Sequence, residues 1–151
     1  MFIRPYRSAD CPALAKLFYE TVHAVCAQDY PPEQLDAWAP GEVDLAAWDA
    51  SFLAHRTLVA VKGETIVGFS DMDGSGYLDR LYVHRDFQRR GVATALCDAL
   101  EAASTAETFT TYASLTARPF FEHRGWRVVR KQTVFRRGVG LRNFVMEKPE
   151  R

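Results

Sequence analysis

Residues 88–94, QRRGVAT, place two cations and a glycine where a helix is expected to begin. The first N–H groups of a helix have no partners within the helix, and they lie at the positive end of its dipole. A phosphate placed there can accept several backbone hydrogen bonds. Gly91 would allow a phosphate to approach closely, and Arg89 and Arg90 would add positive charge beside a diphosphate. The segment therefore predicts an anion-binding site.

Two other phosphate-binding patterns do not fit this segment. It is not a P-loop, because GxxxxGK[ST] is absent, and it is not GxGxxG either. Nucleotide-binding folds that depend on these two patterns are therefore disfavoured, and the anion-binding segment needs another explanation.

The chain around this segment alternates between strand-like and helical spacing of apolar residues. The expected strands cover residues 2–6, 57–61, 64–72, 77–83, 108–114, 126–137 and 140–148. The expected helices cover residues 12–28, 43–55, 91–103 and 117–124, with a further short helix that carries Leu35 and Trp38. No linker or repeat interrupts this order, which predicts one α/β domain with helices on a mixed, partly antiparallel sheet.

The motif at residues 88–93, QRRGVA, resembles the Q/R-x-x-G-x-G/A signature of the GCN5-related N-acetyltransferases (GNAT). Three further segments resemble that family in the same order. Residues 3–18 are similar to its opening strand and helix, and residues 59–69 to the hairpin before its central strand. Residues 117–126, ARPFFEHRGW, are similar to its A-x-x-F-Y-x-x-x-G-F motif. The stretches YPPEQLDAW and NFVMEKP also resemble a subgroup of small bacterial members of unsettled substrate.

The resemblance implies a single GNAT domain over residues 1–151, with a central, mostly antiparallel sheet and helices on both faces. In this fold the fourth and fifth strands splay apart. The implied activity is direct transfer of an acetyl group from acetyl-CoA to a primary amine of a small molecule or peptide. Acetyl-CoA would be the co-substrate, and no metal is expected.

The resemblance also assigns acetyl-CoA contacts to this sequence. Backbone groups of the central strand would pair with the pantetheine arm, N–H groups of the following loop would bind the pyrophosphate, and a serine and two phenylalanines would lie beside the arm. These residues are Leu81, Tyr82, Val83, Gln88, Arg89, Arg90, Gly91, Val92, Ala93, Thr94, Ser114, Phe120 and Phe121.

The resemblance assigns the general base to Asp79, whose carboxylate would accept a proton from the acceptor amine. A salt bridge with Arg80 or Lys62 is the structural alternative for this aspartate. Phe121 departs from the family pattern, because many relatives have a tyrosine there that protonates the departing thiolate. Tyr112, Tyr82 and Tyr30 are the hydroxyls that could replace it.

The acceptor is expected near the first helices and the loops after them, with His23, Tyr30 and Trp38 as candidate contacts. Residues 28–50 hold six acids and no lysine or arginine. Carboxylates and aromatic faces attract cations, so this segment favours a small cationic or aromatic amine. Solvated acids and core tryptophans are the alternative interpretation.

The composition matches a globular chain of 151 residues, with 48% hydrophobic residues and 19 basic residues against 19 acidic ones. This balance and the lack of a long apolar run or secretory segment predict a cytoplasmic protein, monomeric or homodimeric, that binds neither membrane nor nucleic acid. Two other functions stay open. An acyl-CoA sensor with weak catalysis would suit Phe121, and eight cations in residues 118–142 could contact nucleic acid.

Overall fold

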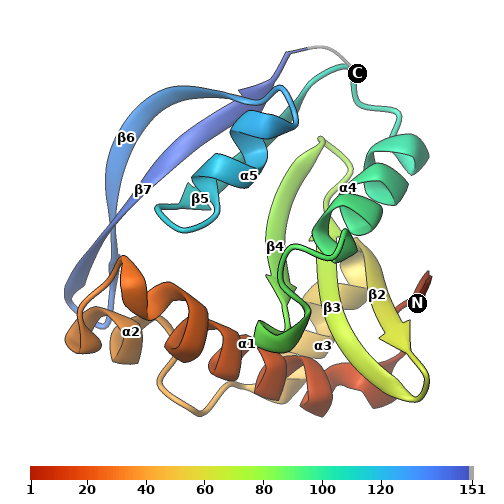
Figure 1. Ribbon diagram of the computed structural model, residues 1–151, viewed down its shortest axis with the longest axis horizontal. Helices are drawn as coiled ribbons and strands as arrows, with labels where there is room; N and C mark the ends of the chain where they lie inside the picture. The colour runs from red at the N-terminus through yellow and green to blue at the C-terminus, as the bar shows by residue number, and fades with distance from the viewer. Residues whose placement is uncertain (150–151) are drawn as a thin grey trace.

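A seven-stranded sheet in the order β1-β2-β3-β4-β5-β7-β6 forms the centre of the computed structural model, which describes residues 1–149 (Figure 1). The predicted domain extended to residue 151, and residues 150–151 lie outside the described part. The strands are β1 (Phe2–Pro5), β2 (Arg56–Lys62), β3 (Thr65–Met72), β4 (Tyr77–Val83), β5 (Phe109–Ser114), β6 (Arg127–Arg136) and β7 (Val139–Lys148). The helices are α1 (Cys11–Val25), α2 (Pro32–Trp38), α3 (Leu45–Ala54), α4 (Val92–Ala103) and α5 (Arg118–His123). The mixed α/β fold expected from the spacing of apolar residues is confirmed.

The sheet is antiparallel except where β4 meets β5. These two strands run parallel and pair at only two positions, Tyr77 with Thr110 and Leu78 with Thr111. The Thr111 hydroxyl donates to the Leu78 carbonyl at 2.8 Å. Beyond Leu78 the two strands diverge, as Figure 1 shows, and the predicted splay at the fourth and fifth strands is confirmed.

Helices cover both faces of the sheet because its strands are apolar on both sides. On one face, α1 and α3 pack against β2 and β3 through residues that include Leu14, Phe52 and Phe69. On the other face, α4 packs through Val92 and Leu96. No helix within residues 1–149 is both long and apolar enough to cross a bilayer.

Gly68 fixes how closely α4 approaches β3. A Cβ at this position would lie 2.8 Å from a Val92 methyl group and 3.2 Å from the Tyr82 carbonyl oxygen. Only a glycine leaves room for the first turn of α4 at this distance. The N-terminus of α4 is thereby held beside the end of β4, where the loop of residues 88–91 joins them.

Candidate active site

The divergence of β4 and β5 opens into a cavity of about 960 Å³. Its walls come from β4, β5, the loop after β4, the first turn of α4, and α5, and part of α1 closes one side. The volume lies at the upper end of the range of about 300–1,000 Å³ typical of small-molecule sites. The cavity therefore has the size for a ligand as long as a cofactor arm.

The loop between β4 and α4 has a backbone conformation suited to binding an anion. Arg89 and Gly91 both have positive φ, 60° and 82°. This conformation is uncommon for arginine and forms concave sets of N–H groups suited to anions. The first helical hydrogen bond of α4 runs from the Ala95 N–H to the Gly91 carbonyl at 3.0 Å, so the preceding N–H groups have no partner within the helix. The amide of Gln88 ties the loop to β4 by donating to the Val83 carbonyl at 2.6 Å.

The edge of β4 that faces β5 carries backbone groups that no neighbouring strand covers. The N–H of His84 donates to the Val67 carbonyl on β3 at 2.8 Å, so residue 84 faces β3. Backbone groups alternate in direction along a strand, so those of Leu81 and Val83 face the cavity. The Val83 carbonyl accepts from Gln88 and, at 3.3 Å, from the Thr21 hydroxyl.

Asp79 occupies a β-bulge on β4. Asp71 pairs with Arg80 and Met72 pairs with Leu78, which leaves Asp79 as the extra residue. A bulge redirects a side chain out of the regular alternation. Partial burial raises the pKa of the Asp79 carboxyl, the negative charge of Asp71 raises it further, and Arg80 opposes both. Asp79 is therefore a stronger proton acceptor than an ordinary surface aspartate.

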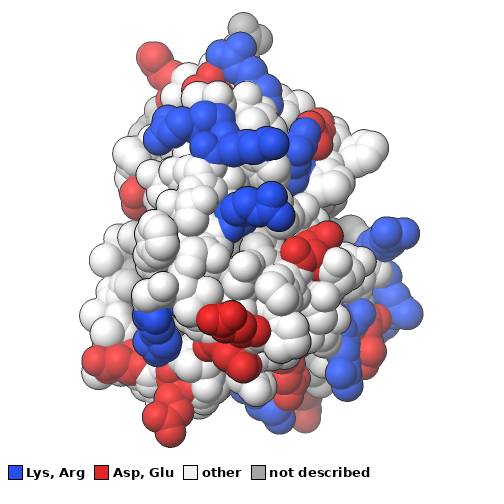
Figure 2. All heavy atoms as spheres, turned by 90° about the vertical axis from the view of Figure 1, so that its left-hand side faces the viewer, with Lys and Arg blue, Asp and Glu red and all other residues white. Residues whose placement is uncertain are grey.

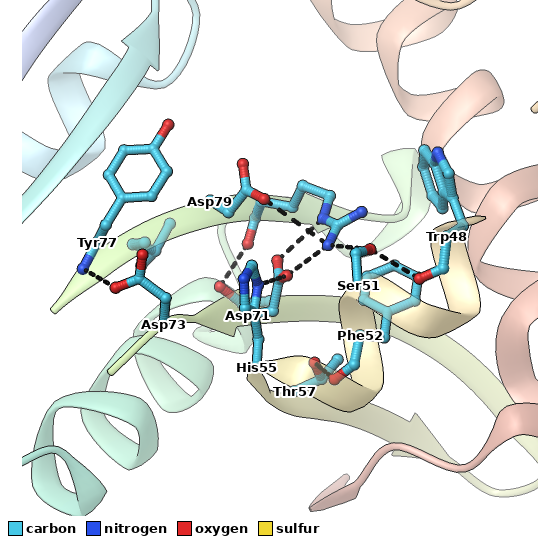
Figure 3. A network of polar contacts seen from close by, with 12 residues as sticks. Trp48, Ser51, Phe52, His55, Thr57, Asp71, Asp73, Tyr77 and Asp79 are labelled. Carbon is cyan, nitrogen blue, oxygen red and sulfur yellow. Dashed lines mark hydrogen bonds and ion pairs between the residues drawn. The ribbon is translucent and has the colours of Figure 1, made fainter. Parts of the chain in front are cut away.

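A polar network lies behind Asp79 (Figure 3). The fully buried Asp71 accepts from Arg80 at 2.6 and 3.1 Å, and its Oδ2 lies 2.8 Å from His55 Nδ1. Arg80 also donates to the Ser51 hydroxyl at 2.9 Å and lies 3.7 Å from Asp79, and its guanidinium stacks 4.1 Å from the centre of the Phe52 ring. This network positions the charged groups next to Asp79.

The three groups His55, Asp71 and Asp79 have ligand-type atoms within 4.8 Å of one another, the spacing of a metal site. Both oxygens of Asp71 already bind Arg80, whose positive charge lies between the carboxylates. In this arrangement the Arg80 guanidinium lies beside the two carboxylates and balances their negative charge, as a metal ion would.

A second cavity, of about 360 Å³, adjoins the first. It lies between β4, β5 and the β6–β7 hairpin, with α1, α2 and α3 contributing aromatic side chains. Five residues line both cavities: Trp38, Asp79, Tyr82, Tyr112 and Ser114. The two cavities therefore meet at the bulged aspartate, with one leading toward the loop of residues 88–94 and the other away from it.

Comparison with known proteins places the chain in a family. Residues 26–148 match the family described as Acetyltransferase (GNAT) domain. The chain is 36% identical over 149 residues to the uncharacterized N-acetyltransferase YafP of Escherichia coli (strain K12), an alignment that covers 98% of this chain and 96% of that protein. The chain belongs to the GNAT family of N-acetyltransferases.

Two solved structures share its fold. A protein from Rhodopseudomonas palustris, described as a GCN5-related N-acetyltransferase and as an aminotransferase of class II, is 36% identical with a TM-score of 0.93, over 97% of this chain and 94% of that one. The PaiA N-acetyltransferase of Thermoplasma acidophilum, solved in complex with coenzyme A, is 17% identical with a TM-score of 0.79, over 97% of each chain. The family and the enzyme class expected from the sequence motifs are confirmed.

The predicted cofactor residues of this GNAT chain gather around the first cavity. Ten of them line it: Leu81, Tyr82, Val83, Gln88, Arg89, Val92, Ala93, Ser114, Phe120 and Phe121. Arg90, Gly91 and Thr94 complete the adjoining loop and helix turn without lining the cavity. Phe121 is buried and packs 5.0 Å from Trp126, measured between ring centres.

The three predicted acceptor residues have different surroundings. Trp38 lines both cavities. Tyr30 lines the second cavity, but its hydroxyl donates to the Arg142 carbonyl at 2.6 Å and accepts from the Leu115 N–H at 3.0 Å. His23 lines neither cavity, and its Nε2 lies 2.7 Å from the Ala39 carbonyl.

The network of Asp71, Arg80 and His55 was not identified from the sequence as part of the site, beyond the possible ion pair of Arg80 with Asp79. Asp71 is nine positions from Arg80 and sixteen from His55, and it meets the first through the register of β3 with β4 and the second through the register of β2 with β3. The one sequence signal is Asp71 itself, an aspartate near the end of an otherwise apolar strand, because a carboxylate is costly to bury without a partner.

Proposed function

We propose that this N-acetyltransferase uses acetyl-CoA as its donor and transfers the acetyl group directly to a primary amine of a small molecule or peptide. The observation that carries the proposal is the continuous opening between β4 and β5, which runs from the loop of residues 88–94 to Asp79. This opening brings an anion-binding turn, an uncovered strand edge and a carboxylate of raised pKa together in one cavity.

The residues present fit the parts of acetyl-CoA. The backbone N–H groups at the start of α4 would bind the pyrophosphate, with Arg89 and Arg90 adding charge. The open edge of β4 would pair with the amides of the pantetheine arm, and Phe120 would pack beside it. The complex of the PaiA protein with coenzyme A supports this assignment for a chain of the same fold.

Asp79 would act as the general base. Its carboxylate would accept the proton that the acceptor nitrogen loses as the new C–N bond forms and the C–S bond of the thioester breaks. A backbone N–H on the open edge of β4 would stabilise the negative charge on the carbonyl oxygen. Coenzyme A would leave as a thiolate, a fair leaving group near neutral pH because a free thiol has a pKa of about 8.5.

Tyr112 is the best-placed hydroxyl to protonate that thiolate in the absence of a tyrosine at position 121. It is 48% exposed and lines both cavities. Tyr82 also lines both cavities, but burial raises the pKa of its hydroxyl, and the Tyr30 hydroxyl is engaged by two backbone groups.

Thiol release from acetyl-CoA in the presence of amino acids, small amines and peptides, with mass spectrometry of the products, tests the proposal. We expect acetylated amine and free coenzyme A in equal amounts. Acetyl-CoA binding without transfer to any amine would instead favour an acyl-CoA sensor, and no binding would contradict the proposal altogether.

A further inference from the structure

The second cavity is basic on the side away from Asp79. Among the described residues that line it, three are arginines, Arg80, Arg136 and Arg142, and Asp79 is the one carboxylate. Arg80 is neutralised by the buried Asp71. The net charge that remains along the wall formed by β6 and β7 is therefore positive.

Arg136 lies on the inner face of the β6–β7 hairpin. Side chains alternate along a strand, so Arg136 shares a face of β6 with Val134, which packs against the core under α1. Burial and the charge of Asp79 raise the pKa of the Tyr77 hydroxyl, and Arg136 is close enough to oppose them. Arg136, Tyr77 and Asp79 all line the second cavity.

Neither Arg136 nor Arg142 forms an ion pair with a carboxylate anywhere in residues 1–149. Arg136 donates only to the neighbouring Phe135 carbonyl, at 3.1 Å. The wall thus presents positive charge to whatever fills the cavity.

The acids that favoured a cationic acceptor do not face this cavity. None of the six acids in residues 28–50 lines it. Asp49 accepts from the Tyr6 hydroxyl at 2.6 Å, Asp44 caps α3, and Asp29 accepts from the Thr116 hydroxyl at 2.7 Å. Figure 2 shows that most acidic side chains on this face of the molecule lie over its lower half, whereas basic side chains lie over both halves.

We infer that the acceptor is a small amine that also carries a carboxylate and an apolar side group, as an amino acid does, an inference that rests on the proposed function. The amine would lie at Asp79, and the carboxylate at Arg136, where a guanidinium can bind it through two parallel hydrogen bonds. Trp38, Trp48, Tyr77 and Tyr112 would pack around the apolar side group. The volume of about 360 Å³ is at the lower end of small-molecule sites and suits an acceptor of amino-acid size.

The positive wall also favours the reactive form of the acceptor. Nearby positive charge disfavours an ammonium and lowers the pKa of the bound amine. The arginines would therefore bind the carboxylate of the acceptor and, by lowering the pKa of its ammonium group, help Asp79 to deprotonate that group.

The test compares matched acceptors with and without the carboxylate. Phenylalanine, leucine and methionine would each be assayed beside the corresponding amide and the decarboxylated amine, with kcat/KM expressed per free amine. We expect the acid of at least one set to exceed both partners by about 10-fold to 100-fold, as for the loss of a hydrogen bond to a charged group. Equal or better turnover of the amides and amines in all three sets would overturn the inference.

Arg136→Ala should remove this preference by lowering kcat/KM for the acid alone. Arg130→Ala is the matched control, since Arg130 is an exposed arginine of the same strand that lines neither cavity, and it should keep the preference. A preference that survives Arg136→Ala, or that Arg130→Ala removes, would contradict the assignment. Calorimetry with acetyl-CoA distinguishes failure of the proposed function from failure of this inference. Absence of binding would contradict the proposed function, whereas binding and transfer without a preference for the carboxylate would contradict only this inference.

Discussion

At the residue scale, Asp79 lines both cavities, and Asp79→Asn is the substitution that tests the proposed general base most directly. We expect kcat/KM to fall by about 10²–10⁴, the usual contribution of a general base. The loss should shrink as the pH rises, because more acceptor is then already deprotonated. Initial rates from pH 6 to about pH 10 measure this. A loss of the same size at every pH would make Asp79 a structural residue.

The same substitution should leave the fold at least as stable as the wild type near neutral pH. Because folding raises the pKa of Asp79, the ionised carboxylate is disfavoured in the folded state at a pH above that raised pKa. The penalty fades as the pH falls through the folded pKa and is absent below the unfolded value of 3.8. Thermal unfolding should therefore give Asp79→Asn an equal or higher Tm at pH 7, with the difference lost near pH 3. A clearly lower Tm at pH 7 would mean that the carboxylate stabilises the fold.

The placement of candidate residues was predictable where it depended on local sequence, and it was not where it depended on strand register. Gly91 and its two arginines lie at the start of α4 as expected, because a helix start and its flanking charges are contiguous in the chain, and anion binding there stays a prediction. The bulge that displaces Asp79, and the pairing of Asp71 with Arg80, follow from how β3 aligns with β4. No pattern in either strand alone specifies that alignment.

At the element scale, the opening between β4 and β5 begins where their last contact ends. Thr111 is 2% exposed, and its hydroxyl donates to the Leu78 carbonyl at that point. Thr111→Val keeps the shape and removes the hydrogen bond, so it should cost about 1 kcal/mol and lower Tm by about 2–4 °C. Thermal unfolding of Thr111→Val beside the wild type measures the bond, because valine and threonine have nearly the same shape. A Tm of Thr111→Val equal to that of the wild type would show that the bond does not help to hold the strands together.

The helices and strands were predictable from the sequence because their apolar residues recur at helical or strand spacing. In α4, Leu96, Cys97 and Leu100 recur at helical spacing and are fully buried. The splay between β4 and β5 came from the family resemblance, since nothing in either strand excludes further pairing. The second cavity could not be predicted at all, because its walls come from seven helices and strands that are spread along the chain.

At the scale of the whole molecule, the chain carries 19 acidic and 19 basic residues, a balance that favours no bulk attraction to nucleic acid. Stacking on bases needs exposed aromatic rings, and in residues 118–142 Phe121 and Trp126 are only 2% and 3% exposed, whereas Phe135 is 68% exposed. One exposed ring offers a much smaller stacking surface than a series of them would. We therefore expect fluorescence anisotropy with single-stranded and duplex oligonucleotides to show no binding tighter than about 10⁻⁶ M at 200 mM salt. Tighter binding that weakens steeply with salt would contradict this expectation.

The central claim, that acetyl-CoA binds at the start of α4, is tested most directly by calorimetry on two glycine variants. Gly91 and Gly63 have φ values of 82° and 63°, and a Cβ at either position would meet no atom within 4 Å. Glutamate at either site should therefore cost a similar amount of backbone strain, about 1–2 kcal/mol. Only Gly91→Glu places a carboxylate beside the proposed pyrophosphate, and this like charge should weaken acetyl-CoA binding by about 100-fold or more, while Gly63→Glu binds as the wild type does. Equal affinity of the two variants for acetyl-CoA would contradict the account.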